Sequence, residues 1–381
     1  MENNVVRKNE NNKSNKKKIA ILTIYDLGNY GNRLQNYATV HLLQNMGYSV
    51  DNLIVNYSSL KTILEKKIKK KVIFDWNLFQ ENPNYVASLP PLEKKRYDSF
   101  KEFSYKYIPP QFVRYISRFP VSKAGRYIRY FVGSDQVWNP TIKQAMDWSF
   151  LPFVPKRKRI SWCASFGIDE ITTQRERIAK NLKRLKHISV RESAAAGIVN
   201  ELTGKNAEVL IDPTLMLSAK DWLEIAEKPE KVDCEKKYIL TYFLGGRSDR
   251  VNADIEKYRN QGYEIYNLMD ETQPDVFVSD PANFIYLISN ASLILTDSFH
   301  ACVFSFIFEK PFLVYSRENG GDKMMSRIDT LLEKMELKRK YVDSGLSNDV
   351  FEHDYSKGKK VLCSEQEKVK LFLNKALGVK I

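Results

Sequence analysis

The fold of this chain is decided by Ser292-Leu-Ile-Leu-Thr-Asp-Ser-Phe-His-Ala-Cys-Val-Phe-Ser-Phe-Ile-Phe-Glu-Lys-Pro-Phe-Leu-Val-Tyr315. The apolar run at its start is typical of a buried parallel strand, and the oxygen-bearing side chains at 296–298 are of the kind that cap a helix. Lys310-Pro311 stops that helix, because proline cannot continue it. Since a second apolar run follows at 312–315, the stretch predicts a β-α-β unit.

This unit places His300, one of four histidines, in the first turn of its helix and at the carboxyl end of a strand. Open parallel sheets bind ligands at that edge, and the exposed amides of a helix N-terminus favour anions. A histidine there can hold a phosphate or move a proton. The alternative is a core histidine that is hydrogen-bonded to the backbone.

Length and cysteine usage limit the class of protein. A chain of 381 residues is long enough for about two domains. The four cysteines lie far apart without a C-x-x-C pair, which argues against a zinc site and a disulfide framework and favours a reducing cytoplasm. No cluster of histidine and acidic residues has metal-ligand spacing, so we expect a reaction without metal or cofactor.

The formal charge of +14 is concentrated in clusters at Lys13–Lys18, Lys61–Lys71 and Lys156–Arg159. Such clusters attract anionic lipid headgroups, nucleic acid or a phosphorylated substrate, and the alternative is ordinary solvated surface. No nucleic-acid motif is present. No apolar run approaches the length of a membrane span, and 1–17 has no hydrophobic core, so it predicts a disordered basic tail and not a secretory signal.

The cluster Lys61–Lys71 contains six lysines, one glutamate and an apolar stripe at helical spacing. We expect this segment to lie on the anionic inner face of the membrane, so that a cytoplasmic protein would make peripheral contact there. An amphipathic helix packed on its own domain is the other interpretation.

The N-terminal half opens with a strand at 18–24, a loop that contains Gly28 and Gly31, a helix through Met46 and a strand at 48–55. This alternation is the beginning of a doubly wound sheet. The two glycines do not form G-x-G-x-x-G, so a dinucleotide site is not supported. A segment at about 57–127 breaks the alternation and is interpreted as a mostly helical insertion.

The alternation of strands and helices resumes at 129 and repeats after 213. We therefore predict an α/β fold of two Rossmann-like domains that face each other across a cleft, which is a glycosyltransferase-B-like architecture. The predicted parts are the tail at 1–17, an acceptor-side domain at 18–212 with its insertion, a donor-side domain at 213–363 and a helix at 364–381 that packs near the domain interface.

Several segments, in this order, resemble the polysaccharide pyruvyl transferase family. They are Gly28-Asn-Tyr-Gly-Asn-Arg-Leu-Gln-Asn-Tyr-Ala38, Gly133-Ser-Asp-Gln-Val-Trp-Asn-Pro140, Ala164-Ser-Phe-Gly167, Val190-Arg-Glu-Ser193, Asp212-Pro-Thr214 and Thr296-Asp-Ser-Phe-His300. The resemblance implies transfer of a pyruvyl group from phosphoenolpyruvate to two hydroxyls of a sugar, giving a ketal and phosphate. The acceptor would belong to a surface or capsular polysaccharide precursor, for which a polyprenyl diphosphate carrier is one option.

The resemblance also implies a donor site. Members of the family use a Ser-Arg-Leu-His type motif, whose arginine and histidine grip phosphoenolpyruvate, and a second arginine. Here the histidine is His300, the second arginine is Arg191, the motif arginine is replaced by Ser298, and Phe299 lies between. Loss of a bidentate cation should weaken donor binding unless another cation replaces it. The candidate replacements are Arg247, Arg317 and Lys323.

Ketal formation needs a proton for the methylene carbon, a base for the sugar hydroxyl and cations for phosphate. His300 can act as acid or phosphate donor. Asp135 is the candidate base, and a cap of the turn that follows is its alternative role. The candidate acceptor-binding residues, which could instead cap the first helix, are Asn32, Arg33 and Gln35.

Two other functions are compatible with the same residues. One is a nucleotide-sugar glycosyltransferase of the same architecture. The other is a non-catalytic carbohydrate-binding or assembly protein that has lost the donor arginine. Release of phosphate from phosphoenolpyruvate, and not of a nucleoside diphosphate from a sugar nucleotide, would distinguish a pyruvyl transferase from the glycosyltransferase. An unaltered phenotype of His300→Ala with intact sugar binding would favour the non-catalytic protein.

Overall fold

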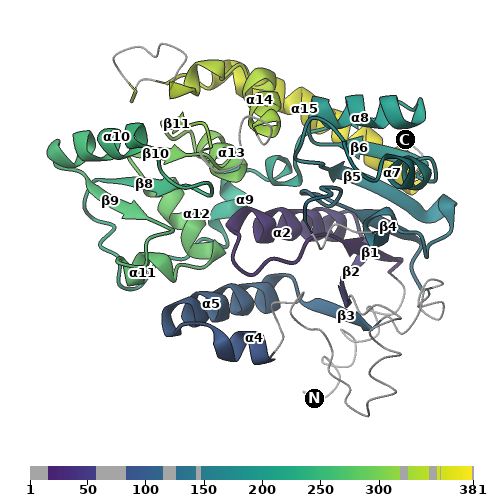
Figure 1. Cartoon of the computed structure of the whole chain (residues 1–381), viewed down its shortest axis with the longest axis horizontal. Coiled ribbons are helices and arrows are strands. Elements are labelled where there is room, and N and C mark those ends of the chain that lie inside the picture. The colour runs from purple at the N-terminus through teal and green to yellow at the C-terminus, as the bar shows by residue number, and fades with distance from the viewer. Residues whose placement is uncertain are drawn as a thin grey trace, which may run out of the picture.

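The computed structural model describes residues 16–56, 83–114, 126–142, 147–317, 325–342, 350–351 and 353–379. Within them the chain forms two α/β halves that lie side by side (Figure 1). The predicted membrane-contacting segment at 61–71 and the candidate donor residue Lys323 lie outside the described residues. No helix in the described ranges is both long enough and apolar enough to cross a membrane.

The first half is built on a parallel sheet in the order β3-β2-β1-β4-β5-β6-β7. Its strands are β1 (Lys18–Leu22), β2 (Ser49–Asn56), β3 (Pro110–Arg114), β4 (Arg129–Val132), β5 (Arg159–Ala164), β6 (His187–Val190) and β7 (Glu208–Val209). Its helices are α2 (Tyr30–Asn45), α4 (Pro83–Ser88), α5 (Pro91–Tyr107), α7 (Arg175–Leu182) and α8 (Ser193–Thr203). β5 is buried along its whole length, as expected for a parallel strand covered on both faces.

The described part of the predicted insertion contains the helices α4 and α5 and also one strand, β3. β3 pairs in parallel with β2, with Leu53 opposite Gln111. An edge strand presents unpaired backbone N–H and C=O groups, and β3 satisfies those of β2. The helical periodicity before residue 108 gave no sign of this pairing, because it joins segments that are far apart in the sequence.

The second half has a smaller parallel sheet in the order β11-β10-β8-β9. Its strands are β8 (Tyr238–Tyr242), β9 (Glu264–Asn267), β10 (Leu293–Thr296) and β11 (Phe312–Val314). Its helices are α9 (Ala219–Leu223), α10 (Asp249–Asn260), α11 (Pro274–Phe277), α12 (Pro281–Asn290), α13 (Phe299–Ile307) and α14 (Ser326–Lys334). The β-α-β unit predicted from 292–315 is therefore confirmed as β10-α13-β11. The fold is the predicted pair of Rossmann-like halves in a glycosyltransferase-B-like arrangement.

The last helix, α15 (Ser356–Leu377), begins about two turns before the predicted start and connects the two halves. Its C-terminal end reaches β4, where the Nε atom of Arg129 donates to the Ala376 carbonyl at 3.0 Å. Nearer its middle, the amide of Gln366 donates to the Leu215 carbonyl at 2.8 Å. The helix thus contacts β4 and the segment that follows β7.

Helix α5 also joins the halves. The buried guanidinium of Arg96 donates to the Tyr30 hydroxyl at 3.0 Å and to the Leu268 carbonyl at 3.1 Å. Tyr30 in turn stacks on Phe284 of α12, with ring centroids 4.7 Å apart. One hydrophobic core therefore runs through both halves, and it sets the distance between the two walls of the site.

Candidate active site

A pocket of about 290 Å³ lies between the two halves. Its N-terminal wall comes from the loops that follow β1 and β4, and its C-terminal wall comes from the start of α13, from α14 and from the loops that follow β8 and β11. The lining residues are Ile24, Asp26, Asn29, Asn32, Asp135, Gln136, Ile142, Leu244, Ser298, Phe299, His300, Arg317 and Arg327. Small-molecule sites in open α/β folds occur at such strand ends.

His300 lies where α2 of one half meets α13 of the other. A Cβ atom added to Gly31 would lie 2.0 Å from the Nδ1 atom of His300, so only glycine permits this approach. The imidazole is buried, and its Nε2 atom has no hydrogen-bond partner among the described residues. The nearest carboxylate is Asp212, whose Oδ1 atom is 3.8 Å from Nε2. A buried polar atom without a partner is costly, and it identifies a place where a ligand can bind.

The capping prediction for α13 is wrong in its details. The Ser298 side chain makes no capping hydrogen bond. The Thr296 hydroxyl instead accepts from the Ser298 amide at 2.9 Å and donates to the Tyr242 carbonyl at 2.6 Å. The Asp297 carboxylate accepts hydrogen bonds from the loop after β8. Without a side-chain cap, the first amides of α13 remain available at the edge of the pocket, where they favour an anion.

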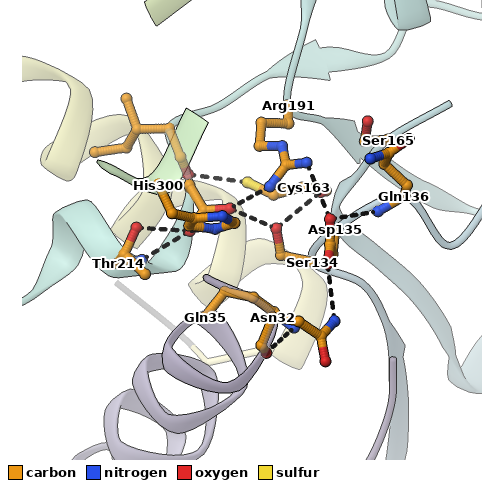
Figure 2. Close-up of polar contacts among 12 residues, drawn as sticks. Asn32, Gln35, Ser134, Asp135, Gln136, Cys163, Ser165, Arg191, Thr214 and His300 are labelled. Atoms are coloured by element: carbon orange, nitrogen blue, oxygen red, sulfur yellow. Dashed lines mark hydrogen bonds and ion pairs between the residues drawn. The ribbon is translucent and has the colours of Figure 1, made fainter. Parts of the chain in front are cut away.

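Arg191 bonds to two carboxylates, and its contact with Asp135 is drawn in Figure 2. Its Nη1 atom donates to Asp212 at 3.0 Å and its Nη2 atom to Asp135 at 3.3 Å. The ring of Phe299 covers the guanidinium, with the Cζ atom 4.5 Å from the ring centroid. Arg191 is therefore the buried counter-ion of Asp135 and Asp212, and it is not among the residues that line the pocket.

Asp135 accepts hydrogen bonds on both oxygens. Asn32 donates to Oδ2 at 2.8 Å, and the amide of Gln136 donates to Oδ1 at 2.9 Å, beside the Arg191 contact. Burial alone would raise the pKa of Asp135, but the charges of Arg191 and His300 outweigh it and lower the pKa to about 2. A carboxylate with so low a pKa and with both oxygens occupied is a weak proton acceptor. This geometry favours a positioning role for Asp135.

Burial lowers the pKa of His300 to about 4, and the nearby positive charge of Arg191 acts in the same direction, against the opposing effect of Asp212. The imidazole is therefore neutral near pH 7 in the free protein. A neutral ring carries one N–H donor and one lone pair, so it can accept a proton from a hydroxyl or donate a hydrogen bond to an anion.

Arg327, which sequence reasoning missed, brings a buried cation to the C-terminal wall. Its side chain is buried, and its Nε atom has no hydrogen-bond partner among the described residues. Burial, helped by the positive charge of Arg191, lowers its pKa to about 10. Arg327 is also the second residue of α14, where a positive charge opposes the helix dipole. An arginine at this unfavourable position is the feature of the sequence that could have indicated a functional role.

Arg317 is held at the same wall by Asp297. The Nε atom of Arg317 donates to Asp297 at 3.1 Å, and the same carboxylate accepts from the amides of Leu244 and Gly245 at 2.7 and 2.8 Å. Arg317 therefore lies in the pocket as expected for a replacement cation. Arg247 is exposed and is not among the lining residues.

The three candidate acceptor residues separate into two groups. Asn32 lines the pocket. Arg33 and Gln35 do not, because Arg33 donates to the Ile24 carbonyl at 2.8 Å and Gln35 donates to the Thr23 hydroxyl at 3.1 Å. Both are fully buried beneath the loop after β1. Arg33 and Gln35 therefore stabilise the loop after β1 and do not line the pocket.

A family model described as polysaccharide pyruvyl transferase matches residues 29–319. The chain belongs to the polysaccharide pyruvyl transferase family. The matched region includes both walls of the pocket except Ile24, Asp26 and Arg327. No curated protein matches the sequence significantly.

Three of the solved structures that are similar to this chain are an epimerase, MnaA and MurG. UDP-GlcNAc 2-epimerase from Neisseria meningitidis bound to UDP-GlcNAc is 9% identical with a TM-score of 0.40, covering 96% of this chain and 94% of that one. Staphylococcus aureus MnaA with UDP is 12% identical with a TM-score of 0.44, covering 96% and 98%. MurG from Acinetobacter baumannii is 11% identical with a TM-score of 0.38, covering 92% and 95%.

Proposed function

We propose that this transferase moves a pyruvyl group from phosphoenolpyruvate to two hydroxyls of a sugar in a polysaccharide precursor, with no cofactor. The observation that carries the proposal is the C-terminal wall of the pocket. There a buried arginine, Arg327, and a buried neutral histidine, His300, each have one nitrogen atom without a hydrogen-bond partner in the described part of the chain. Both lie next to a helix N-terminus that has no side-chain cap.

A donor with two anionic groups suits this wall. Phosphoenolpyruvate carries a phosphate and a carboxylate, and Arg317 and Arg327 both line the pocket. The planar guanidinium group of Arg327 can bind either anion with two parallel hydrogen bonds. Arg317, whose Nε and Nη2 atoms donate to Asp297, adds positive charge beside it. In this proposal Arg327 supplies the cation that the family motif carries at position 298, and the serine there leaves room for the ligand.

The proposed chemistry balances as follows. A proton adds to the methylene carbon of the enol, which becomes a methyl group, while the first sugar hydroxyl bonds to the adjacent carbon. The bond from that carbon to the phosphate oxygen then breaks, and the second hydroxyl takes its place. The hydroxyls release two protons, of which one replaces the proton consumed at the methyl group and the other leaves with the phosphate.

His300 is the residue proposed to move protons in these steps. It is neutral near pH 7, so its free ring nitrogen can accept the proton of a sugar hydroxyl. The resulting imidazolium would then lie close to Asp212, which stabilises that charge. Arg191 and Asp135 are proposed to hold Asp212, Phe299 and Asn32 in place.

The test is an assay of phosphate release from phosphoenolpyruvate with a panel of polyprenyl-linked, nucleotide-linked and free sugars. We expect acceptor-dependent phosphate release together with a new ketal methyl signal in the proton NMR spectrum. His300→Ala should lower turnover at least about a hundredfold, whereas His41→Ala, on the outer part of α2, should not. Release of a nucleoside diphosphate from a sugar nucleotide, without consumption of phosphoenolpyruvate, would overturn the proposal.

A further inference from the structure

The two walls of the pocket differ in charge. The C-terminal wall holds the cation Arg327, the ion pair of Arg317 with Asp297, and the amides at the start of α13. The described lining residues of the N-terminal wall include two carboxylates, Asp26 and Asp135, and no lysine or arginine. A small molecule bound between the walls therefore meets cations on one side and anions on the other.

Asp26 is held in a fixed place by the loop between β1 and α2. Its Oδ1 atom accepts from the amide of Gly28 at 2.9 Å, and its own amide donates to the Oδ1 atom of Asn32 at 3.0 Å. An aspartate that bonds the amide two residues ahead forms a compact turn that restricts the carboxylate. The carboxylate of Asp26 thus has a fixed position in the wall.

Buried Arg33 does not give this wall a cationic surface. Its side chain is 0% exposed, and its Nε and Nη2 atoms donate to the Asn32 side chain and the Ile24 carbonyl. Its charge reduces the negative potential of the wall but presents no donor to the pocket. The positive charge of Arg191 is likewise neutralised by Asp135 and Asp212. These three side chains together carry one net negative charge.

The remaining groups of the wall suit a sugar ring. Asn29, Asn32 and Gln136 supply side-chain amides, which offer both donors and acceptors to hydroxyl groups. Ile24 and Ile142 supply aliphatic surface for the C–H face of a ring. Sites of this kind combine apolar surface with a few oriented polar groups.

We propose that the acceptor sugar is uncharged or carries an amine, and that Asp26 is the residue that disfavours acid sugars. This inference rests on the proposed function in so far as the N-terminal wall is the acceptor side. A carboxylate in the wall should repel a nearby carboxylate on the sugar by about 1 kcal/mol. That repulsion corresponds to about a fivefold to tenfold preference for a neutral sugar over its uronic acid counterpart.

The experiment compares binding of matched methyl glycosides by saturation-transfer NMR. The pairs are glucoside and glucuronide, galactoside and galacturonide, and mannoside and mannuronide, which differ only in a hydroxymethyl or carboxylate group. Inorganic phosphate at saturating concentration fills the cationic wall, so that the uronides cannot bind there. We expect at least one neutral member to bind about fivefold or more tightly than its uronide, with a gap that narrows as salt is added.

Asp26→Asn is the variant that isolates the charge, because an asparagine oxygen can still accept from the Gly28 amide. It should reduce the preference to less than about twofold. Asp233→Asn removes an exposed carboxylate that lies before β8, far from the pocket, and should leave the preference unchanged. Equal binding of neutral and acidic sugars by the wild type, or binding of neither, would overturn the inference. Failure of phosphate release in the turnover assay would overturn only the proposed reaction, since these measurements require no turnover.

Discussion

Gly31 and His300 are in van der Waals contact across the domain interface. Gly31 belongs to the first turn of α2 and His300 to the first turn of α13. A Cβ atom on Gly31 would overlap three atoms of the histidine side chain, at 2.0, 2.2 and 2.6 Å. The position of the candidate catalytic imidazole in the second half is therefore set by the absence of a side chain in the first half.

Gly31→Ala should displace His300 and lower turnover at least tenfold, because the added methyl group occupies the space of the imidazole. The measurement is the rate of phosphate release, with circular dichroism to confirm folding. Gly197→Ala is the matched control, since a Cβ there meets nothing within 4 Å. That helical substitution should stabilise the protein by about 0.5–1 kcal/mol and leave the rate unchanged. Normal turnover in Gly31→Ala would show that the observed contact does not position His300.

Arg327→Met should separate stability from activity. The Nε atom of this buried cation has no partner within the described ranges. Its removal should leave the free energy of unfolding unchanged or raise it by about 1 kcal/mol. Binding of phosphoenolpyruvate, measured by calorimetry, should weaken at least tenfold because the anion loses a guanidinium partner. Arg250→Met, on exposed α10, is the control and should change neither quantity. A loss of stability without a loss of affinity would assign Arg327 a structural role.

Arg191→Ala should destabilise the fold by about 3–5 kcal/mol, because it leaves Asp135 and Asp212 buried next to each other without their shared cation. Urea unfolding followed by tryptophan fluorescence measures the change. Arg175→Ala removes an exposed pair with Glu201 and should cost no more than about 1 kcal/mol. If the free energy of unfolding fell by the same small amount in both variants, the buried ion pairs would not be the main contribution of Arg191 to stability.

The buried histidine predicts a pH dependence of stability. The pKa of His300 is about 4 in the folded protein, below its ordinary value near 6.5, mainly because of burial. Between these values the unfolded chain binds a proton that the folded protein does not, so stability falls as pH decreases. The wild type should lose up to about 3 kcal/mol relative to His300→Asn between pH 7 and 4. If the free energy of unfolding changed equally with pH in the two proteins across this range, the lowered pKa of His300 would be contradicted.

Ser298→Arg restores the arginine of the family motif. If the donor is phosphoenolpyruvate bound at the C-terminal wall, the variant should bind it at least as tightly as the wild type, because a further guanidinium meets the same anion. Calorimetric titration measures the affinity, and Ser298→Met, which adds bulk without charge, is the control. A similar loss of affinity in both variants would mean that the pocket is shaped for a serine.

The order of elements followed from local patterns. The apolar runs, the capped and proline-stopped helices and the histidine of β10-α13-β11 all depend on interactions between residues close in the sequence. The parallel pairing of β3 did not follow, because the groups that it satisfies belong to β2, more than fifty residues earlier. The side-chain cap predicted for α13 is not formed for a similar reason, since the Asp297 carboxylate accepts from the amides of Leu244 and Gly245 in another loop.

The sequence by itself determined the two Rossmann-like halves, the family and the place of His300 at a strand end, since these follow from hydrophobic periodicity and from short motifs. Only the tertiary structure decided which charges remain available to a ligand. Arg191 has the charge of a donor ligand, yet two carboxylates from other segments bond to it. Arg327, in contrast, lines the pocket with an Nε atom that no described residue bonds. The charge of a side chain is a local property, but its neutralisation depends on neighbours that only folding brings within a few ångströms.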